Sequence, residues 1–537
     1  MTATTLNLAH LLDHQARLTP AREAVVWAAM RWTYGQVHAM ASQVAAGLRG
    51  LGLQPGDHVA LSCPNVPYFP IAYYGILKMG GVVVPLNVLL KPREIAFHLN
   101  DSDAKALLVF EGTPELPMAQ MAREACDDVS ACAHLIVMTA NPASPSPVDR
   151  TISLGQLMQA QAPLSETYPS SPDDTAVILY TSGTTGQPKG AELSHFNMAV
   201  NAIASRDMYA PMLNAGVEAI NKYLITLPLF HSTGQTTQMN AGISSGGTLV
   251  LLPRFDAAAT LQAMREERIN FWVGVPTMYW ALLQHARQSD ADTSAIAEDL
   301  KICVSGGAPM PLAVLEDFEK TFGVRVLEGY GLSETSPVAC FNQMHLPPKL
   351  GTVGPPIFGC EVRVVDGQDH PLPSGERGEI VIRGHNVMKG YYKRPAETAE
   401  ALRGGWFHTG DVGVIDADGY VSIVDRTKDL ILRGGMNVYP REIEEVLMTH
   451  PAVSLAAVIG VPDERLGEEV KAFVVFKPGS AVDPEDLIVW SKGHLAAYKY
   501  PRTIEVRESL PVGPTGKVFK RGLRPTQADA SRTTKPE

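Results

Sequence analysis

The stretch TSGTTGQPKG, residues 181–190, follows the apolar run AVILY at 176–180. Its glycines, threonines and serine leave backbone N–H groups and hydroxyls open to a ligand, and Lys189 adds a positive charge. Groups of this kind bind oxyanions, so the stretch predicts a phosphate-binding loop at the end of a buried strand. The alternative interpretation is a mobile surface loop.

A P-loop of the Walker type does not fit this stretch. That motif needs four residues between its glycines and a lysine followed by Ser or Thr. Here Gly190 follows Lys189, and the spacing from Gly183 to Gly186 is too short. The loop therefore belongs to another class of nucleotide-binding protein, if it binds a nucleotide.

Length and composition predict a globular protein of two or more domains. The chain has 537 residues, of which 45% are hydrophobic and 19% charged. This length exceeds what one hydrophobic core supports. The formal net charge of -11 argues against a nucleic-acid-binding face, because phosphate backbones are bound by clustered Lys and Arg.

The cysteine pattern and the N-terminal sequence favour a cytoplasmic location. Six cysteines form no CxxC pair and indicate neither a zinc site nor a disulfide framework. The first residues lack the basic and apolar regions of a signal peptide. The uncharged stretch 59–77 contains three prolines, so we expect a strand, a turn and a buried helix there and no transmembrane segment. Transient association with a membrane is left open.

Several segments repeat one plan of strand, glycine or proline turn, and helix. In 301–323 a β-rich run precedes two glycines, Pro311 begins a helical pattern, and Gly323 ends it. This alternation predicts an α/β fold with a mainly parallel sheet covered by helices, and ligands at the carboxyl ends of the strands. After about residue 425, a helix beginning at Pro440 and strands at 452–461 and 469–476 predict a small separate module.

Five motifs occur in one order along the chain: YTSGTTGQPKG (180–190), EGYGLSET (328–335), WFHTGD (406–411), DRTKDLILRGGMNVYPREIE (425–444) and PTGKVFKR (514–521). Together they resemble the adenylate-forming superfamily, which includes acyl-CoA synthetases, peptide-synthetase adenylation domains and luciferases. The resemblance implies a large N-terminal ATP- and acyl-binding domain (1–425), a hinge (426–428) and a small mobile α+β domain (429–523). The polar tail 524–537 is predicted to be disordered.

The resemblance also implies a site for ATP and Mg²⁺. Residues expected to contact the β- and γ-phosphates are Thr181, Ser182, Gly183, Thr184, Thr185, Gly186 and Lys189. Those expected around the adenine and the acyl group are Gly306, Gly307, Ala308, Glu328, Gly329, Tyr330 and Gly331, with the Tyr330 ring stacked on the base. Ser333 would contact phosphate, and Glu334 with Thr181 would hold Mg²⁺, a hard cation that prefers oxygen ligands.

Asp411 is expected to accept hydrogen bonds from both ribose hydroxyls, assisted by Arg426. Each of these matches has an ordinary alternative when taken singly. Tyr330 suits a core, Asp411 a turn and Arg426 a solvated surface. The order of the motifs favours the functional interpretation.

The resemblance makes Lys517 the catalytic lysine. A cation placed at the phosphorus centre stabilises charge that builds up as the carboxylate attacks and pyrophosphate leaves. Lys428 falls on the hinge, about which the small domain would rotate so that Gly434 and Gly435 admit the pantetheine arm of coenzyme A. Many relatives carry lysine where this chain has Leu432, which leaves the role of Arg433 toward phosphate open.

The stretch LPLFHSTGQ, residues 227–235, bears on the class of acid that the protein activates. Amino-acid activators of the family place an aspartate near Phe230–Ser232 to bind the ammonium, whereas this chain has His231. His231 matches the aromatic position beside the acyl group or the CoA entry, and its ordinary alternative is a core or capping histidine. We therefore include His231 among the catalytic residues and regard amino acids as disfavoured substrates.

The stretch 271–283 adds Trp272, Tyr279 and Trp280, which suit either an apolar acyl pocket or a plain core. Its GVPTMY resembles fatty acyl-CoA synthetases, so we predict a medium- or long-chain fatty acid–CoA ligase that uses ATP, Mg²⁺ and coenzyme A. Alternatives are a ligase for an aryl or other short acid, a fatty acyl-AMP ligase without CoA, a luciferase-like oxygenase and a silent binding relative. Oligomeric state is not indicated.

Overall fold

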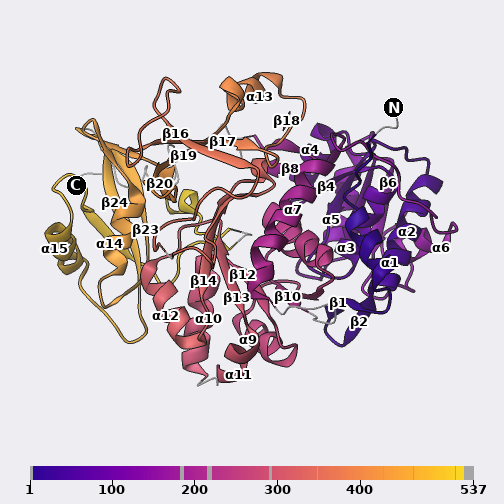
Figure 1. The fold of residues 1–537 in the computed structure, drawn as a ribbon, viewed down its shortest axis with the longest axis horizontal. Helices are drawn as coiled ribbons and strands as arrows, with labels where there is room; N and C mark the ends of the chain where they lie inside the picture. The colour runs from indigo at the N-terminus through magenta and orange to yellow at the C-terminus, as the bar shows by residue number, and fades with distance from the viewer. Residues whose placement is uncertain are drawn as a thin grey trace, which may run out of the picture.

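The structure is a computed structural model, and it describes residues 4–181, 187–213, 221–289, 293–347, 349–426, 429–463, 465–513 and 516–524. Within these residues the chain forms two eight-stranded sheets, a four-stranded sheet and a five-stranded sheet. Figure 1 shows the C-terminal elements in orange and yellow, beside helices α10 and α12 of the preceding part.

The first eight-stranded sheet has the pattern predicted from strand–helix alternation. Its central strands from β14 to β1 pair in parallel, and both edge strands are antiparallel. In spatial order the strands are β15 (Val338–Phe341), β14 (Val326–Gly331), β13 (Ile302–Gly306), β12 (Phe271–Gly274), β10 (Lys222–Ile225), β11 (Thr248–Leu251), β1 (Glu23–Trp27) and β2 (Met30–Thr33).

The second eight-stranded sheet is parallel from β8 to β7, and β9 and β18 are added antiparallel at one edge. In spatial order the strands are β18 (Gly390–Tyr391), β9 (Lys189–Ser194), β8 (Thr175–Thr181), β4 (Val82–Pro85), β3 (His58–Ser62), β5 (Ala106–Phe110), β6 (His134–Met138) and β7 (Ile152–Ser153).

Helices follow most of the parallel strands. Those before residue 402 are α1 (His10–Leu18), α2 (Tyr34–Gly50), α3 (Tyr68–Lys78), α4 (Pro92–Asp101), α5 (Met118–Asp127), α6 (Leu154–Gln159), α7 (His195–Tyr209), α8 (Ala241–Ser244), α9 (Ala257–Glu266), α10 (Pro276–Gln288), α11 (Ser294–Asp299), α12 (Leu312–Phe322) and α13 (Pro395–Ala401). Helix α3 is buried along its whole length, as the apolar run predicts. None of the described helices is long and apolar enough to cross a membrane.

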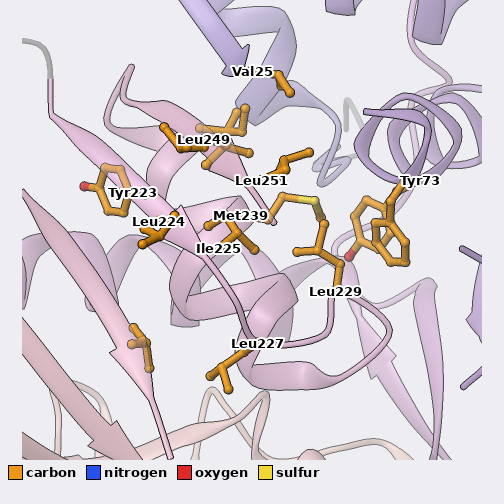
Figure 2. Close-up of a cluster of buried hydrophobic side chains, with 14 of the residues drawn as sticks. Val25, Tyr73, Tyr223, Leu224, Ile225, Leu227, Leu229, Met239, Leu249 and Leu251 are labelled. Atoms are coloured by element: carbon orange, nitrogen blue, oxygen red, sulfur yellow. The ribbon is translucent and has the colours of Figure 1, made fainter. Parts of the chain in front are cut away.

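One hydrophobic core extends through both eight-stranded sheets. Figure 2 shows Tyr223, Leu224 and Ile225 of β10 near Leu249 and Leu251 of β11, with Met239 and Tyr73 close by. Met239 comes from the π-helical segment η2 (Gly234–Asn240), and Tyr73 comes from α3 of the other half. Parallel sheets need apolar cover on both faces, and here the two halves supply part of it to one another.

The four-stranded sheet is antiparallel and was not predicted. It consists of β16 (Cys360–Val365), β17 (Gly378–Gly384), β19 (Phe407–Ile415) and β20 (Val421–Arg426). Its strands follow one another without intervening crossover helices, except for the short α13, so they lack the strand–helix period that indicated the parallel sheets. Strand β19 of this sheet carries Asp411, one of the predicted site residues.

The C-terminal elements have a core of their own. They comprise β21 (Ile431–Arg433), β22 (Met436–Val438), α14 (Pro440–Met448), β23 (Val453–Asp463), β24 (Gly467–Phe476), α15 (Pro484–His494) and β25 (Thr503–Val506). The predicted helix at Pro440 and the two predicted strands are confirmed. The boundaries at 425, 428 and 523 stay predictions, and the tail 525–537 lies outside the described residues.

Two of the aromatic residues considered for an acyl pocket belong to the core. Trp272 and Tyr279 are fully buried, with ring centroids 4.6 Å apart, and both rings lie close to Phe318 of α12. The Trp272 indole N–H donates to Thr226 Oγ1 at 2.9 Å. The core interpretation therefore applies to both residues.

We expect Trp272→Phe to lower the free energy of unfolding by about 2 kcal/mol or more, because it leaves a void and an unpaired Thr226 hydroxyl. Chemical denaturation measures this loss. The ranking of acid substrates should stay as in the wild type, and a changed ranking with unchanged stability would contradict the core assignment.

Candidate active site

The ends of three parallel strands carry the predicted nucleotide site. Strand β8 ends at Thr181, β13 at Gly306 and β14 at Gly331. The register of β13 and β14 pairs Ser305 with Glu328 and Gly306 with Gly329. The carboxyl ends of parallel strands are where α/β sheets bind ligands, so these three ends lie where the predicted site is expected.

Glu334 is the centre of a polar cluster. Its carboxylate is buried, and Oε1 accepts hydrogen bonds from Thr181 Oγ1 at 3.2 Å and from the Tyr391 hydroxyl at 3.0 Å. The Lys189 ammonium lies 5.3 Å from the centre of the Tyr391 ring. Thr181 and Glu334 therefore meet directly, and Tyr391 lies between Glu334 and Lys189. The sequence interpretation missed Tyr391 because no motif marks it.

Glu334 and Thr181 fit a divalent cation. Oε2 of Glu334 has no hydrogen-bond partner among the described residues. A buried carboxylate oxygen with a hydroxyl oxygen beside it matches the hard ligands of Mg²⁺, whose other positions are usually filled by phosphate oxygens and water. The hydroxyl of Ser333, which directly precedes Glu334, lies 3.5 Å from the hydroxyl of Ser232.

The residues predicted for adenine and ribose also meet. The Tyr330 hydroxyl donates to Asp411 Oδ2 at 2.6 Å, and Asp411 is buried. Burial, followed by the charge of Asp411, raises the pKa of Tyr330. Asp411 of β19 lies opposite Arg426 of β20 in the strand register, although the Arg426 side chain is outside the described part.

Glu328 has an unusual protonation equilibrium for a carboxylic acid. Burial raises its pKa to about 7, and the positive charge of Arg441 opposes this shift. Its Oε2 accepts a long hydrogen bond from the Met310 backbone N–H at 3.4 Å. Near neutral pH this side chain is therefore partly protonated, so it offers a nucleobase both a hydrogen-bond donor and a hydrogen-bond acceptor.

Lys517 reaches Gly307 from the C-terminal part of the chain. Its Nζ lies 2.9 Å, and its Cε 2.6 Å, from the point where a Cβ on residue 307 would be. Gly307 has φ of 76°, which also favours glycine. Ala308 follows and is half-buried. The positive φ favours glycine at residue 307, and a Cβ there would displace the Lys517 ammonium from this position.

The charge of Lys517 also affects the protonation of His231. Burial, followed by the charge of Lys517, lowers the pKa of His231 to about 3. The imidazole is therefore neutral at physiological pH and contributes a hydrogen-bonding ring without a charge. His231 directly precedes Ser232 and lies one turn before Gln235 at the start of η2.

The residues predicted for coenzyme A are not part of these clusters. Arg433 is buried and forms a bidentate ion pair with Glu469 of β24, with N–O distances of 2.6 and 2.8 Å. Gly434 and Gly435 are exposed, and Leu432 is 53% exposed. Their role toward CoA stays a prediction. Residues that lie outside the described part are Ser182, Gly183, Thr184, Thr185, Gly186 and Lys428.

The comparisons with known proteins agree with this geometry. The AMP-binding enzyme family matches residues 12–392, and the AMP-binding enzyme C-terminal domain matches residues 442–517. The chain belongs to the AMP-binding enzyme family. It is an ATP-dependent acyl-CoA ligase of the adenylate-forming superfamily.

Two curated relatives of this AMP-binding enzyme have the same identity to it. A feruloyl-CoA synthase of Amycolatopsis sp is 36% identical over 518 residues, covering 95% of this chain and 97% of the relative. A long-chain-fatty-acid–CoA ligase of Bacillus subtilis (strain 168) is 36% identical over 535 residues, covering 96% and 93%. ATP-bound MatB from Rhodopseudomonas palustris is 33% identical, with a TM-score of 0.85 over 97% of this chain and 98% of that one.

The pKa of His231 predicts a pH-dependent stability. In the unfolded chain His231 binds a proton near its ordinary pKa of 6.5, whereas in the folded protein it stays neutral down to about pH 3. Its contribution to stability is therefore complete above pH 6.5 and is lost progressively as the pH falls toward 3. We expect His231→Gln to lose less stability than the wild type between pH 7.5 and 5 in urea denaturation.

The exposed His14 supplies the control for this comparison. His14→Gln reports the general effect of removing one imidazole. A wild-type protein and a His231→Gln variant with the same pH dependence would show that His231 protonates freely in the folded state.

Proposed function

We propose that this AMP-binding enzyme activates a medium- or long-chain fatty acid. In the first step the acid and Mg·ATP would give an acyl-adenylate and pyrophosphate. In the second step CoA would displace AMP to give the thioester. The support for the fatty acid is the similarity over 96% of the chain to a long-chain-fatty-acid–CoA ligase, together with the GVPTMY stretch.

The observation that carries the proposed first step is the approach of Lys517 to Gly307. The acid carboxylate attacks the α-phosphorus, and negative charge increases on the phosphate oxygens as the bond to pyrophosphate breaks. A fixed ammonium stabilises this charge in the transition state more than in the ground state, and removal of one such group typically costs about 10²- to 10³-fold in rate.

The other clusters are proposed to bind and orient the substrates. Glu334 and Thr181 would hold Mg²⁺, which neutralises phosphate charge when it is bound. Asp411 would accept from the ribose hydroxyls, and Tyr330 would orient Asp411 and pack on the base. Neutral His231 would lie beside the acyl group. We also propose that residues 426–428 form the hinge about which the part from 429 to 523 rotates between the two steps.

An acid panel tests the proposal. Alkanoic acids of increasing length and hydroxylated cinnamic acids are each supplied with Mg·ATP, and pyrophosphate is measured with and without CoA. We expect pyrophosphate and AMP with the longer alkanoic acids, and thioester only with CoA. Formation of ADP and phosphate would rule out adenylation, and pyrophosphate without any thioester would indicate an acyl-AMP ligase.

Lys517→Ala tests the assignment of the lysine. We expect adenylation to fall by about 10²-fold or more, because the charge on phosphorus is no longer stabilised. Transfer from a supplied acyl-adenylate to CoA should stay close to the wild-type rate. Pyrophosphate release and thioester formation are measured separately, and equal losses in both steps would indicate a misfolded protein or a wrong assignment.

One buried group favours an aryl acid as the second candidate. Gln235 is fully buried, and neither its Nε2 nor its Oε1 has a hydrogen-bond partner among the described residues. A buried unpaired amide costs free energy unless a ligand or water satisfies it. The phenol of a hydroxycinnamic acid would supply such a partner, and a feruloyl-CoA synthase is as similar to this chain as the fatty acid ligase.

Gln235→Met separates the two candidates. If a phenol binds Gln235, kcat/KM for hydroxycinnamic acids should fall by about 10-fold or more while that for alkanoic acids changes little. Asn201→Leu is the control, because Asn201 is also fully buried and both its amide atoms are already bonded to the Val338 backbone, at 2.8 and 3.1 Å. An unchanged ratio of the two kcat/KM values would remove the support for the aryl acid.

A further inference from the structure

Thr277 makes an unexpected contact at the start of helix α10. A threonine near a helix N-terminus usually bonds to the backbone of its own helix. Thr277 Oγ1 instead donates to the Gly516 carbonyl at 2.5 Å, across the seam between α10 and the C-terminal elements. No side-chain cap hydrogen bond is formed at the N-terminus of α10, whose first residue is Pro276. The hydroxyl thus acts between two parts of the chain.

Gly516 fits closely against the same helix start. Its φ is 78°, and a Cβ on it would lie 2.9 Å from Val275 Cγ2 and 3.3 Å from Met278 Cε. A larger residue would push the segment away from α10. Position 516 is thus restricted by its positive φ and by its close approach to α10, and its carbonyl accepts the hydrogen bond from Thr277.

The segment that carries Lys517 is a hairpin attached at its base to the C-terminal elements. Val512 and Val518 form an antiparallel bridge, and the Gly513 N–H donates to the Lys517 carbonyl at 2.7 Å. Lys520 forms an ion pair with Glu444 of α14 at 2.7 Å. The base therefore moves with the C-terminal part, whereas the tip at Gly516 rests on α10.

We infer that Thr277 is a positioning residue that docks the hairpin tip on α10 and so places the Lys517 ammonium at Gly307. The inference rests on the proposed role of Lys517 in adenylation. Thr277 touches neither the nucleotide clusters nor His231 by any described hydrogen bond, and it acts through the residue next to Lys517. When the C-terminal part rotates away for the second step, the contact is broken.

A second contact lies along the same face of α10. The Trp280 indole N–H donates to Ser454 Oγ of β23 at 2.5 Å. Beside it is a cavity of about 360 Å³ lined by residues of α10, α12 and the C-terminal part, including Arg287, Asp317, Met448 and Lys477. The seam is therefore incompletely packed here, and two directional hydrogen bonds cross it, one at each end of the helical turn between Thr277 and Trp280.

Thr277→Val and Thr277→Ser test the inference as a matched pair. Valine keeps the shape and removes the hydroxyl, whereas serine keeps the donor. For Thr277→Val we expect kcat of adenylation to fall by about 3- to 10-fold, the effect of losing one hydrogen bond, with unchanged KM for ATP and acid. Transfer from a supplied acyl-adenylate to CoA should keep its wild-type rate, and Thr277→Ser should resemble the wild type in both steps.

Ser454→Ala probes the second contact from the other side of the seam. It should show the same asymmetry between the two steps with a smaller loss, because the Trp280–Ser454 contact does not involve the hairpin that carries Lys517. Equal adenylation rates for Thr277→Val and Thr277→Ser, or equal losses in both steps, would overturn the inference.

Amide hydrogen exchange tests the docking without any substrate. The amides of Gly516 and Phe519 donate to Gly513 and Pro511 at 2.9 and 2.7 Å. They should exchange faster in Thr277→Val than in Thr277→Ser, and equal exchange would contradict docking by Thr277. A wild type that releases no pyrophosphate with any acid would instead overturn the proposed function, because the exchange comparison is independent of activity.

Discussion

The parallel pairing of β13 with β14 is the constraint on which the site depends. It places Gly306 opposite Gly329, so two chain segments end at one edge with little side-chain bulk between them. Beyond this edge, β13 continues into Gly307, and β14 continues into the segment that leads to Glu334. With β8 ending at Thr181 in the other sheet, three strand ends supply Thr181, Gly306 and the segment leading to Glu334. The common core of both sheets keeps these ends in place.

Two kinds of polar group occupy this edge. Glu334 and Asp411 are buried carboxylates that accept hydroxyl hydrogen bonds, which compensate for part of their desolvation. His231 and Glu328 are shifted toward their neutral forms by burial. The candidate site therefore contains carboxylates that accept hydroxyl hydrogen bonds and, apart from them, two groups that burial shifts toward their neutral forms.

The seam along α10 joins this edge to the C-terminal part. A large apolar interface would hold the two parts in one arrangement, whereas two hydrogen bonds beside a cavity can be broken and remade at a small cost in free energy. A seam of this kind is compatible with the proposed movement of Lys517 away from Gly307 between the two steps. The buried ion pair of Arg433 with Glu469 keeps β21 and β24 together in the C-terminal part.

Local pattern in the sequence determined the strand–turn–helix plan of 301–323, the buried α3, the helix at Pro440 and the family, because period and turn residues act over a few positions. Ordered motifs also predicted that Tyr330, Asp411, Thr181 and Glu334 belong to one site. The tertiary structure alone decided that Trp272 is core, that Tyr391 joins Glu334 to Lys189, and that Thr277 meets Gly516. These contacts join residues far apart in the chain, and their geometry depends on sheet register and helix packing that no local pattern encodes.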